Sequence, residues 1–271
     1  MIFVKQLANV LGGLAIVAGL LLGSNAANAY GITAILIASP VKASGKDPVP
    51  TGAERSAGEF DGFLREVARR VGADYKSITV KGQDFDWNKI KARIEAIDVA
   101  SDDVVFVYYA GHGAHPTGDP TEFPSMTLPD NGYISESYIA NLGTLKKARL
   151  SVVVFDTCNI LVRAAAGSPR ESSLEGINER NYNVVVVKSL KRMFSSGPKQ
   201  ILLAGQREGD FSYFDENGGW YTDHLINAFL DPFADKVYGW DVVLARADKE
   251  FEVPNVTATQ RPVSSPRALA Q

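Results

Sequence analysis

The chain has 271 residues, enough for one large α/β domain or two small ones. Its apolar and charged fractions are those of an ordinary folded globular protein. The formal net charge is −3, so no broad basic field indicates binding to nucleic acid. Long runs of one charge and internal repeats are both missing from the sequence.

The first 29 residues have the three-part pattern of a secretory signal peptide. A positively charged start precedes an apolar run over residues 7–22, and residues 27–29 (Ala-Asn-Ala) form a small-x-small cleavage pattern. We therefore expect residues 1–29 to be removed and the mature protein to be exported, either periplasmic or secreted. The alternative is a membrane anchor formed by an uncleaved 7–22 segment, because this run approaches the length that spans a bilayer.

The apolar pattern of the remaining chain alternates between strands and helices. In chain order, we expect strand 31–38, helix 53–71, strand 77–81, helix 87–97, strand 104–109, helix 138–145, strands 151–156 and 200–204, and helices 220–230 and 237–251. Residues 183–194 fit either a strand or a helix, whereas 39–52 and 114–132 have the Gly and Pro content of loops. Residues 263–271 are polar and are expected to form a loose tail.

Strands that alternate with helices predict an α/β fold with a mostly parallel sheet and helices on both faces. Right-handed crossovers bring the carboxyl ends of such strands to one edge, and ligand sites lie beyond those ends. His112 follows one predicted strand and stands between two glycines, while Cys158 follows another. Both residues are therefore expected at the functional edge of the sheet.

Cys158 is the only cysteine, so an intrachain disulfide is impossible. The residue is either a small buried apolar side chain or a reactive thiol. A neighbouring imidazole can take the proton of a thiol during attack and later donate a proton to a leaving amine. The N–H groups of Gly113 and Cys158 could hold the oxyanion of a tetrahedral intermediate. For His112 the alternative is an ordinary turn histidine bonded to the backbone.

Residues 102–113 (DDVVFVYYAGHG) resemble the histidine motif of the caspase-like cysteine peptidases, especially metacaspases and related bacterial proteins. Residues 152–159 (VVVFDTCN) resemble the Asp-x-Cys nucleophile motif of that family. His112 and Cys158 lie 46 residues apart (158 − 112), close to the spacing of about fifty between the two residues in caspases. Weaker matches lie at 129–135, 190–206, 218–222 and 260–262, in family order.

The resemblance implies a caspase-like three-layer sandwich over residues 30–262 and the activity of a cysteine-type endopeptidase. It also implies that Cys158 is the nucleophile, that His112 is the acid–base, and that Gly113 and Cys158 supply the oxyanion donors. Because no third residue stands out to orient the imidazole, we expect a Cys158–His112 dyad. The chain departs from its relatives at Asn159-Ile160-Leu161, where they usually carry His-Ser-Gly.

Asp156 lies two residues before the nucleophile. In metacaspases, an acid at this place helps to bind Arg or Lys at the cleavage site, which implies a basic preference here. The alternative is that Asp156 accepts backbone N–H groups at the strand end. No set of metal ligands is visible, and no acidic cluster places the calcium ion that activates some relatives.

We therefore expect a peptide or protein as substrate, no cofactor, no nucleic acid partner, and membrane contact only through an uncleaved signal segment. Two other classes of function stay open. A catalytically weak member acting as a binding or scaffold domain is favoured by the missing glycine after Cys158, but the intact His112 counts against it. A non-peptidase hydrolase of the serine type is disfavoured because the chain has no Gly-x-Ser-x-Gly.

Overall fold

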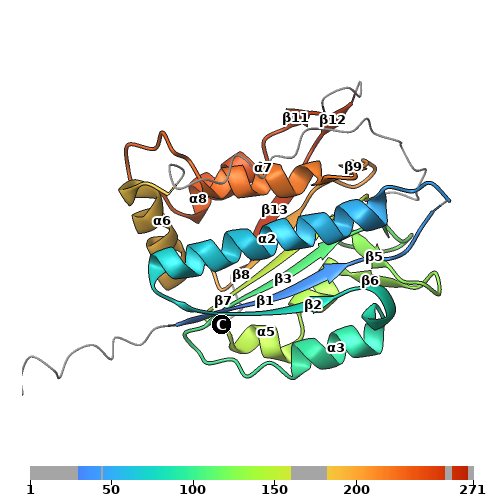
Figure 1. Ribbon diagram of the computed structural model, residues 1–271, viewed down its shortest axis with the longest axis horizontal. Helices are drawn as coiled ribbons and strands as arrows, with labels where there is room; N and C mark the ends of the chain where they lie inside the picture. Colours follow the sequence, from blue (N-terminus) through green and yellow to red (C-terminus); the bar gives the residue numbers. More distant parts are fainter. Residues whose placement is uncertain (1–29, 44, 160–181, 254–257, 268–271) are drawn as a thin grey trace, which may run out of the picture.

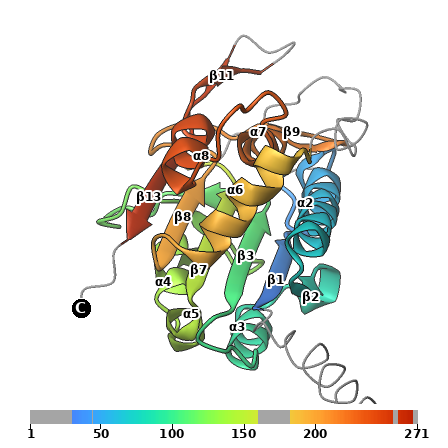
Figure 2. The same cartoon turned by 90° about the vertical axis from the view of Figure 1, so that its left-hand side faces the viewer.

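The computed structural model describes residues 30–43, 45–159, 182–253 and 258–267, so the expected signal peptide lies outside the described residues. A six-stranded sheet forms the centre of the molecule, with strand order β13-β8-β7-β3-β1-β2. Figure 2 shows most of these strands side by side. The strands are β1 (Gly31–Ala38), β2 (Asp74–Val80), β3 (Val104–Ala110), β7 (Leu150–Asp156), β8 (Gln200–Ala204) and β13 (Val263–Arg267).

Strands β1, β2, β3, β7 and β8 all run parallel to one another in this sheet. Only β13 is antiparallel, and it pairs with β8. This arrangement confirms the expected mostly parallel sheet. Every residue of β3 and of β7 is buried, since helices cover both faces of the sheet. The carboxyl ends of β1, β3 and β7 therefore lie together at one edge, to the right in Figure 1.

Helices form the two outer layers of the molecule (Figure 1). One layer holds α2 (Val49–Val71), α6 (Val184–Ser195), α7 (Trp220–Phe229) and α8 (Trp240–Ala247). The other holds α3 (Trp87–Glu95), α4 (Glu136–Ala140) and α5 (Gly143–Lys147). Alternate residues of β3 point to opposite faces of the sheet. Phe106 and Tyr108 pack in the core under α2, α6, α7 and α8, whereas Val105 and Val107 pack in the core under α3, α4 and α5. The expected three-layer sandwich is confirmed.

The remaining described strands and one short helix lie in the connections. A short 3-10 helix, η1 (Gly82–Asp84), precedes α3. Three short strands follow β3 and form an antiparallel sheet near the carboxyl edge: β4 (Gly113–Ala114), β5 (Ser125–Thr127) and β6 (Tyr133–Ser135). Two small hairpins come later: β9 (Phe214–Asp215) with β10 (Gly218–Gly219), and β11 (Phe251–Glu252) with β12 (Thr259–Gln260).

Several expected boundaries need correction. The ambiguous segment 183–194 is helix α6, and the Asn183 side chain accepts a hydrogen bond from the Val186 N–H at its start. The expected helix 138–145 is two shorter helices, α4 and α5. The expected helix 237–251 is only α8, because the backbone is still extended at Gly239, directly before the helix.

The expected loose tail 263–271 is also wrong over its first five residues. Polar residues predict exposure, but they do not exclude a sheet edge, where half of a strand's backbone groups face solvent. Residues 263–267 pair with β8 along its full length.

The described part of the chain has no helix long and apolar enough to cross a membrane.

Removing β13 should destabilise the fold. A chain that ends at Pro262 loses the antiparallel ladder on β8, which we expect to cost about 3 kcal/mol at roughly 1 kcal/mol for each hydrogen bond. The midpoint of thermal unfolding should therefore fall by about 6–12 °C, measured by circular dichroism. A chain that ends at Arg267 keeps the whole strand and serves as the control. Equal midpoints for the two truncations would contradict a stabilising role for β13.

Candidate active site

The ends of β3 and β7 place His112 and Cys158 at the same level of the sheet. The two strands are neighbours, and their parallel register pairs Ala110 with Asp156. His112 and Cys158 each lie two residues beyond that last pair. The sheet edge therefore brings the two sequence-predicted residues side by side.

The two turns are also tied to each other beyond the strands. The Gly111 N–H donates to the Asp156 carbonyl at 3.2 Å, and the Thr157 hydroxyl donates to the Gly111 carbonyl at 2.7 Å. Gly111 has φ of 147°, a conformation that L side chains rarely adopt, and a Cβ atom there would collide with Ser39. Only glycine fits the turn before His112.

The backbone of His112 is held from two further directions. Its carbonyl accepts a hydrogen bond from the Tyr109 hydroxyl at 2.5 Å and another from the Thr127 N–H at 3.0 Å. Both donors are anchored, since Tyr109 is fully buried in β3 and Thr127 belongs to β5. The position of the imidazole is thus fixed by the core and not by a loose loop.

A third residue orients the imidazole, contrary to the expected dyad. The Asp47 carboxylate lies 2.5 Å from Nε2 of His112, and both side chains are buried. Asp47 belongs to the connection after β1, the third strand whose carboxyl end reaches this edge. In the sequence, Asp47 is recognisable only as an acidic residue in the expected 39–52 loop. Its contact with His112 joins residues far apart in the chain, so no local sequence pattern predicts it.

Hydrogen bonds keep Asp47 ionised. Burial alone would raise the pKa of Asp47, but hydrogen bonds from the Ala43 N–H (2.6 Å), His112 and the Val49 N–H (3.0 Å) outweigh it. The pKa of Asp47 is therefore lower than the ordinary value. An ionised carboxylate on Nε2 fixes that nitrogen as the donor and leaves Nδ1 as the free ring nitrogen.

Cys158 is held as a neutral thiol. Its side chain is buried, and Sγ donates to the Ser212 carbonyl at 3.5 Å. Burial raises the pKa of Cys158 to about 11, and the charges of Asp156 and Asp47 act in the same direction. Among the side chains that the structure describes, Sγ makes its hydrogen bond to Ser212 and none to His112.

The backbone N–H of Gly113 is not part of the β4–β5 ladder. Because the Thr127 N–H bonds to the His112 carbonyl, Gly113 and Met126 form a non-hydrogen-bonded pair of the β4–β5 ladder. The N–H of Gly113 therefore points away from β5. A Cβ atom on Gly113 would collide with Thr157 and with the Ser125 carbonyl, so no other residue fits.

The carboxylate of Asp156 is fully buried in a network of hydroxyl groups. Its Oδ1 accepts from the Ser212 hydroxyl at 2.9 Å, and its Oδ2 accepts from the N–H (3.0 Å) and hydroxyl (2.6 Å) of Thr222. The Thr222 hydroxyl also lies 2.6 Å from that of Tyr108. These contacts hold α7 and the Ser212 segment on the end of β7.

The structure offers no metal site among the residues it describes, since no three His, Cys, Asp or Glu side chains gather there in a metal-binding group.

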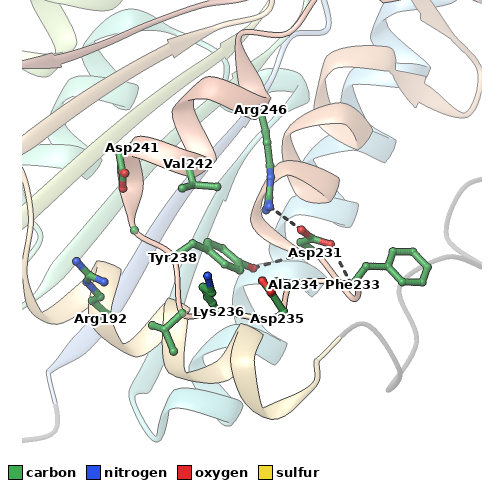
Figure 3. Close-up of a pocket in the computed structure, with 12 residues that line it drawn as sticks. Arg192, Asp231, Phe233, Ala234, Asp235, Lys236, Tyr238, Asp241, Val242 and Arg246 are labelled. Atoms are coloured by element: carbon green, nitrogen blue, oxygen red, sulfur yellow. Dashed lines mark hydrogen bonds and ion pairs between the residues drawn. The ribbon is translucent and has the colours of Figure 1, made fainter.

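A hollow of about 360 Å³ lies elsewhere, beside α6 and α8 (Figure 3). Inside it, Arg246 pairs with Asp231 at 2.5 Å and lies over the Tyr238 ring at 4.9 Å. None of the residues that line it belongs to the site around His112 and Cys158.

Comparison with known proteins identifies the family of this chain. The model of the caspase domain matches residues 57–270, and the chain belongs to the caspase-domain family. No curated protein matches the chain significantly.

Two solved structures are similar in fold. Caspase-1 from Spodoptera frugiperda matches with a TM-score of 0.54 and 13% identity, over 90% of this chain and 90% of that one. A protein from Geobacter sulfurreducens matches with a TM-score of 0.51 and 15% identity, over 89% of this chain and 95% of that one. The expected caspase-like fold is thus confirmed.

The raised pKa of Cys158 predicts slow alkylation near neutral pH, because the thiolate is the reacting form. Between pH 6 and about pH 10, the rate with iodoacetamide should rise about tenfold per pH unit, because the thiolate fraction does so below a pKa of about 11. Mass spectrometry measures this rate without ambiguity, since Cys158 is the only cysteine. A rate that already levels off near pH 6 would contradict the prediction.

Proposed function

We propose that this protein is a cysteine endopeptidase in which Cys158 attacks the substrate and His112 moves the protons. The family supports a peptidase that acts on peptides or proteins. The observation that supports this assignment is that the carboxyl ends of β1, β3 and β7 lie at the same edge of the sheet. His112 and Cys158 follow paired positions on β3 and β7, and Asp47 reaches His112 from the connection after β1.

The reaction begins from a neutral thiol. As substrate binds, the free Nδ1 of His112 accepts the thiol proton while Sγ attacks the carbonyl carbon of the peptide bond. The N–H groups of Gly113 and Cys158 stabilise the oxyanion that forms. The imidazolium then gives its proton to the leaving amine, and a thioester remains on Cys158. Water hydrolyses the thioester with the same histidine as base and restores the thiol.

Asp47 stabilises the charged intermediate of this cycle. The imidazolium carries a positive charge next to a buried carboxylate that is already ionised, so the charge is neutralised where it develops. The carboxylate also keeps Nδ1 directed to the thiol side of the ring, because it occupies Nε2. The site therefore works as a triad of Cys158, His112 and Asp47, and not as the dyad that the sequence indicates.

A preference for Arg or Lys before the cleaved bond is a finer proposal that rests on Asp156. A basic side chain would find a carboxylate close to the nucleophile. Ser212 and Thr222 already occupy both oxygens of this carboxylate, which favours the alternative of a residue that holds the strand end. A peptide panel separates the two roles.

Export of the protein is proposed from the first 29 residues of the sequence alone. N-terminal sequencing of the protein recovered outside the cytoplasm tests this proposal, with Tyr30 as the expected first residue.

Peptides with Arg, Lys or Asp before the cleaved bond test the proposed function when they are incubated with the protein and with Cys158→Ala. Cleavage by the wild-type protein should vanish in the variant, because no other thiol is present. Cleavage that survives Cys158→Ala would refute the assignment. If the wild-type protein cleaves no peptide, with or without calcium, the scaffold function is favoured instead.

The same panel reports the role of Asp156. Preference for Arg and Lys over Asp supports the basic pocket, and equal cleavage supports the structural role.

Replacement of Asp47 by Asn should lower kcat by about 10²- to 10⁴-fold, the range over which positioned acid–base groups contribute. The amide has the shape of the carboxylate but does not neutralise the imidazolium. Asp241→Asn, an exposed change on α8, is the matched control and should keep the wild-type kcat. Steady-state kinetics on the best peptide measures both variants. A wild-type kcat in Asp47→Asn would show that the dyad is sufficient.

A further inference from the structure

Asn159, the residue after the nucleophile, is fully buried although its side chain is polar. Its backbone pairs with the loop after β8: the Asn159 N–H donates to the Asp210 carbonyl at 3.1 Å, and the Asn159 carbonyl accepts from the Gly209 N–H at 3.3 Å. This loop is held in turn by Arg261, whose side chain lies 3.6 Å from the Asp210 carboxylate. The turn that carries Cys158 is thereby fastened to a second, independently anchored loop.

The side chain of Asn159 uses both of its donor hydrogens. Nδ2 donates to the Glu122 carbonyl at 2.9 Å and to the Gln206 carbonyl at 3.3 Å. Because two carbonyl oxygens face Nδ2, the orientation of the amide is fixed and Oδ1 must face the other way. Asn159 therefore joins the nucleophile turn to the loop between β4 and β5 as well as to the loop after β8.

His115 completes this arrangement. Its Nδ1 lies 3.2 Å from Oδ1 of Asn159, which is an acceptor, so Nδ1 carries a hydrogen. Its Nε2 lies 3.7 Å from a carboxylate oxygen of Glu208, on the loop after β8. A single histidine thus bridges the buried amide and the loop that holds the backbone of Asn159.

We propose that Asn159 is a positioning residue for Cys158, held in place by His115. This inference rests on the proposed function. Asn159 shares a peptide bond with Cys158, so pinning its N–H and side chain fixes the backbone on one side of the nucleophile. The loop after β8 continues to Ser212, whose carbonyl accepts from Sγ. The same loop therefore contacts both the backbone of Asn159 and the thiol of Cys158.

Three variants test the proposal. Asn159→Asp keeps the shape of the side chain but turns an oxygen toward the Glu122 and Gln206 carbonyls, where it loses both donors. His115→Ala removes the donor to Oδ1, while His115→Asn keeps a nitrogen at the place of Nδ1 and loses only the contact with Glu208. Asp241→Asn is again the remote control.

We expect Asn159→Asp to lower kcat by about 10- to 100-fold with KM within threefold, because small displacements of a reacting group cost rate more than binding. His115→Ala should lower kcat by a smaller factor, and His115→Asn should restore it to within about twofold. Wild-type kcat in Asn159→Asp, or equal losses in the two His115 variants, would overturn the proposal. Thermal unfolding run in parallel identifies a variant that fails to fold, and the His115 pair then decides.

A failure of the proposed function looks different, because wild type and Cys158→Ala then behave alike, either both active or both inactive. Positioning is tested in that case by alkylation of Cys158 with iodoacetamide. A faster reaction in Asn159→Asp and in His115→Ala than in His115→Asn supports it, since a relaxed turn exposes the thiol. Unchanged rates in all the variants would overturn it.

Discussion

The site depends on the register between β3 and β7. Parallel strands that end at the same level deliver two turns to one place, and two hydrogen bonds between Gly111, Asp156 and Thr157 lock those turns together. A slip by one residue would move His112 away from Cys158 and reverse the faces of every buried side chain in the strand. The Tyr109 hydroxyl bound to the His112 carbonyl and the hydroxyl groups around the Asp156 carboxylate oppose such a slip, because each of these contacts would be lost.

Strand ends were readable from the sequence because apolar runs have a local signature, and so His112, Cys158 and Gly113 were found as site candidates. Asp47 was missed because it lies in a loop whose composition only indicates exposure, while its burial depends on a fold that brings β1 beside β3. For Asp156, the sequence left two roles open, and only the hydroxyl groups of Ser212 and Thr222 show what the carboxylate contacts. The prediction of a loose tail was wrong for a similar reason, because the pairing of residues 263–267 with β8 joins segments far apart in the sequence.

The surroundings of Cys158 favour a thiol that is not activated before substrate arrives. Burial and the charges of Asp156 and Asp47 oppose the thiolate and raise the pKa of Cys158. In the proposed mechanism, the proton therefore leaves Sγ only as the attack proceeds, and the hydrogen bonds of Asn159 and Asp156 hold the backbone around the nucleophile until then.

The strand β13 has a consequence for assembly. It covers the outer edge of β8, the last parallel strand of the sheet, and it includes Pro266, which has no N–H to offer a neighbouring chain. A second copy could pair its own β8 with this one only by displacing β13 first. The edge at which another molecule could extend the sheet on this side is therefore that of β13 and not that of β8.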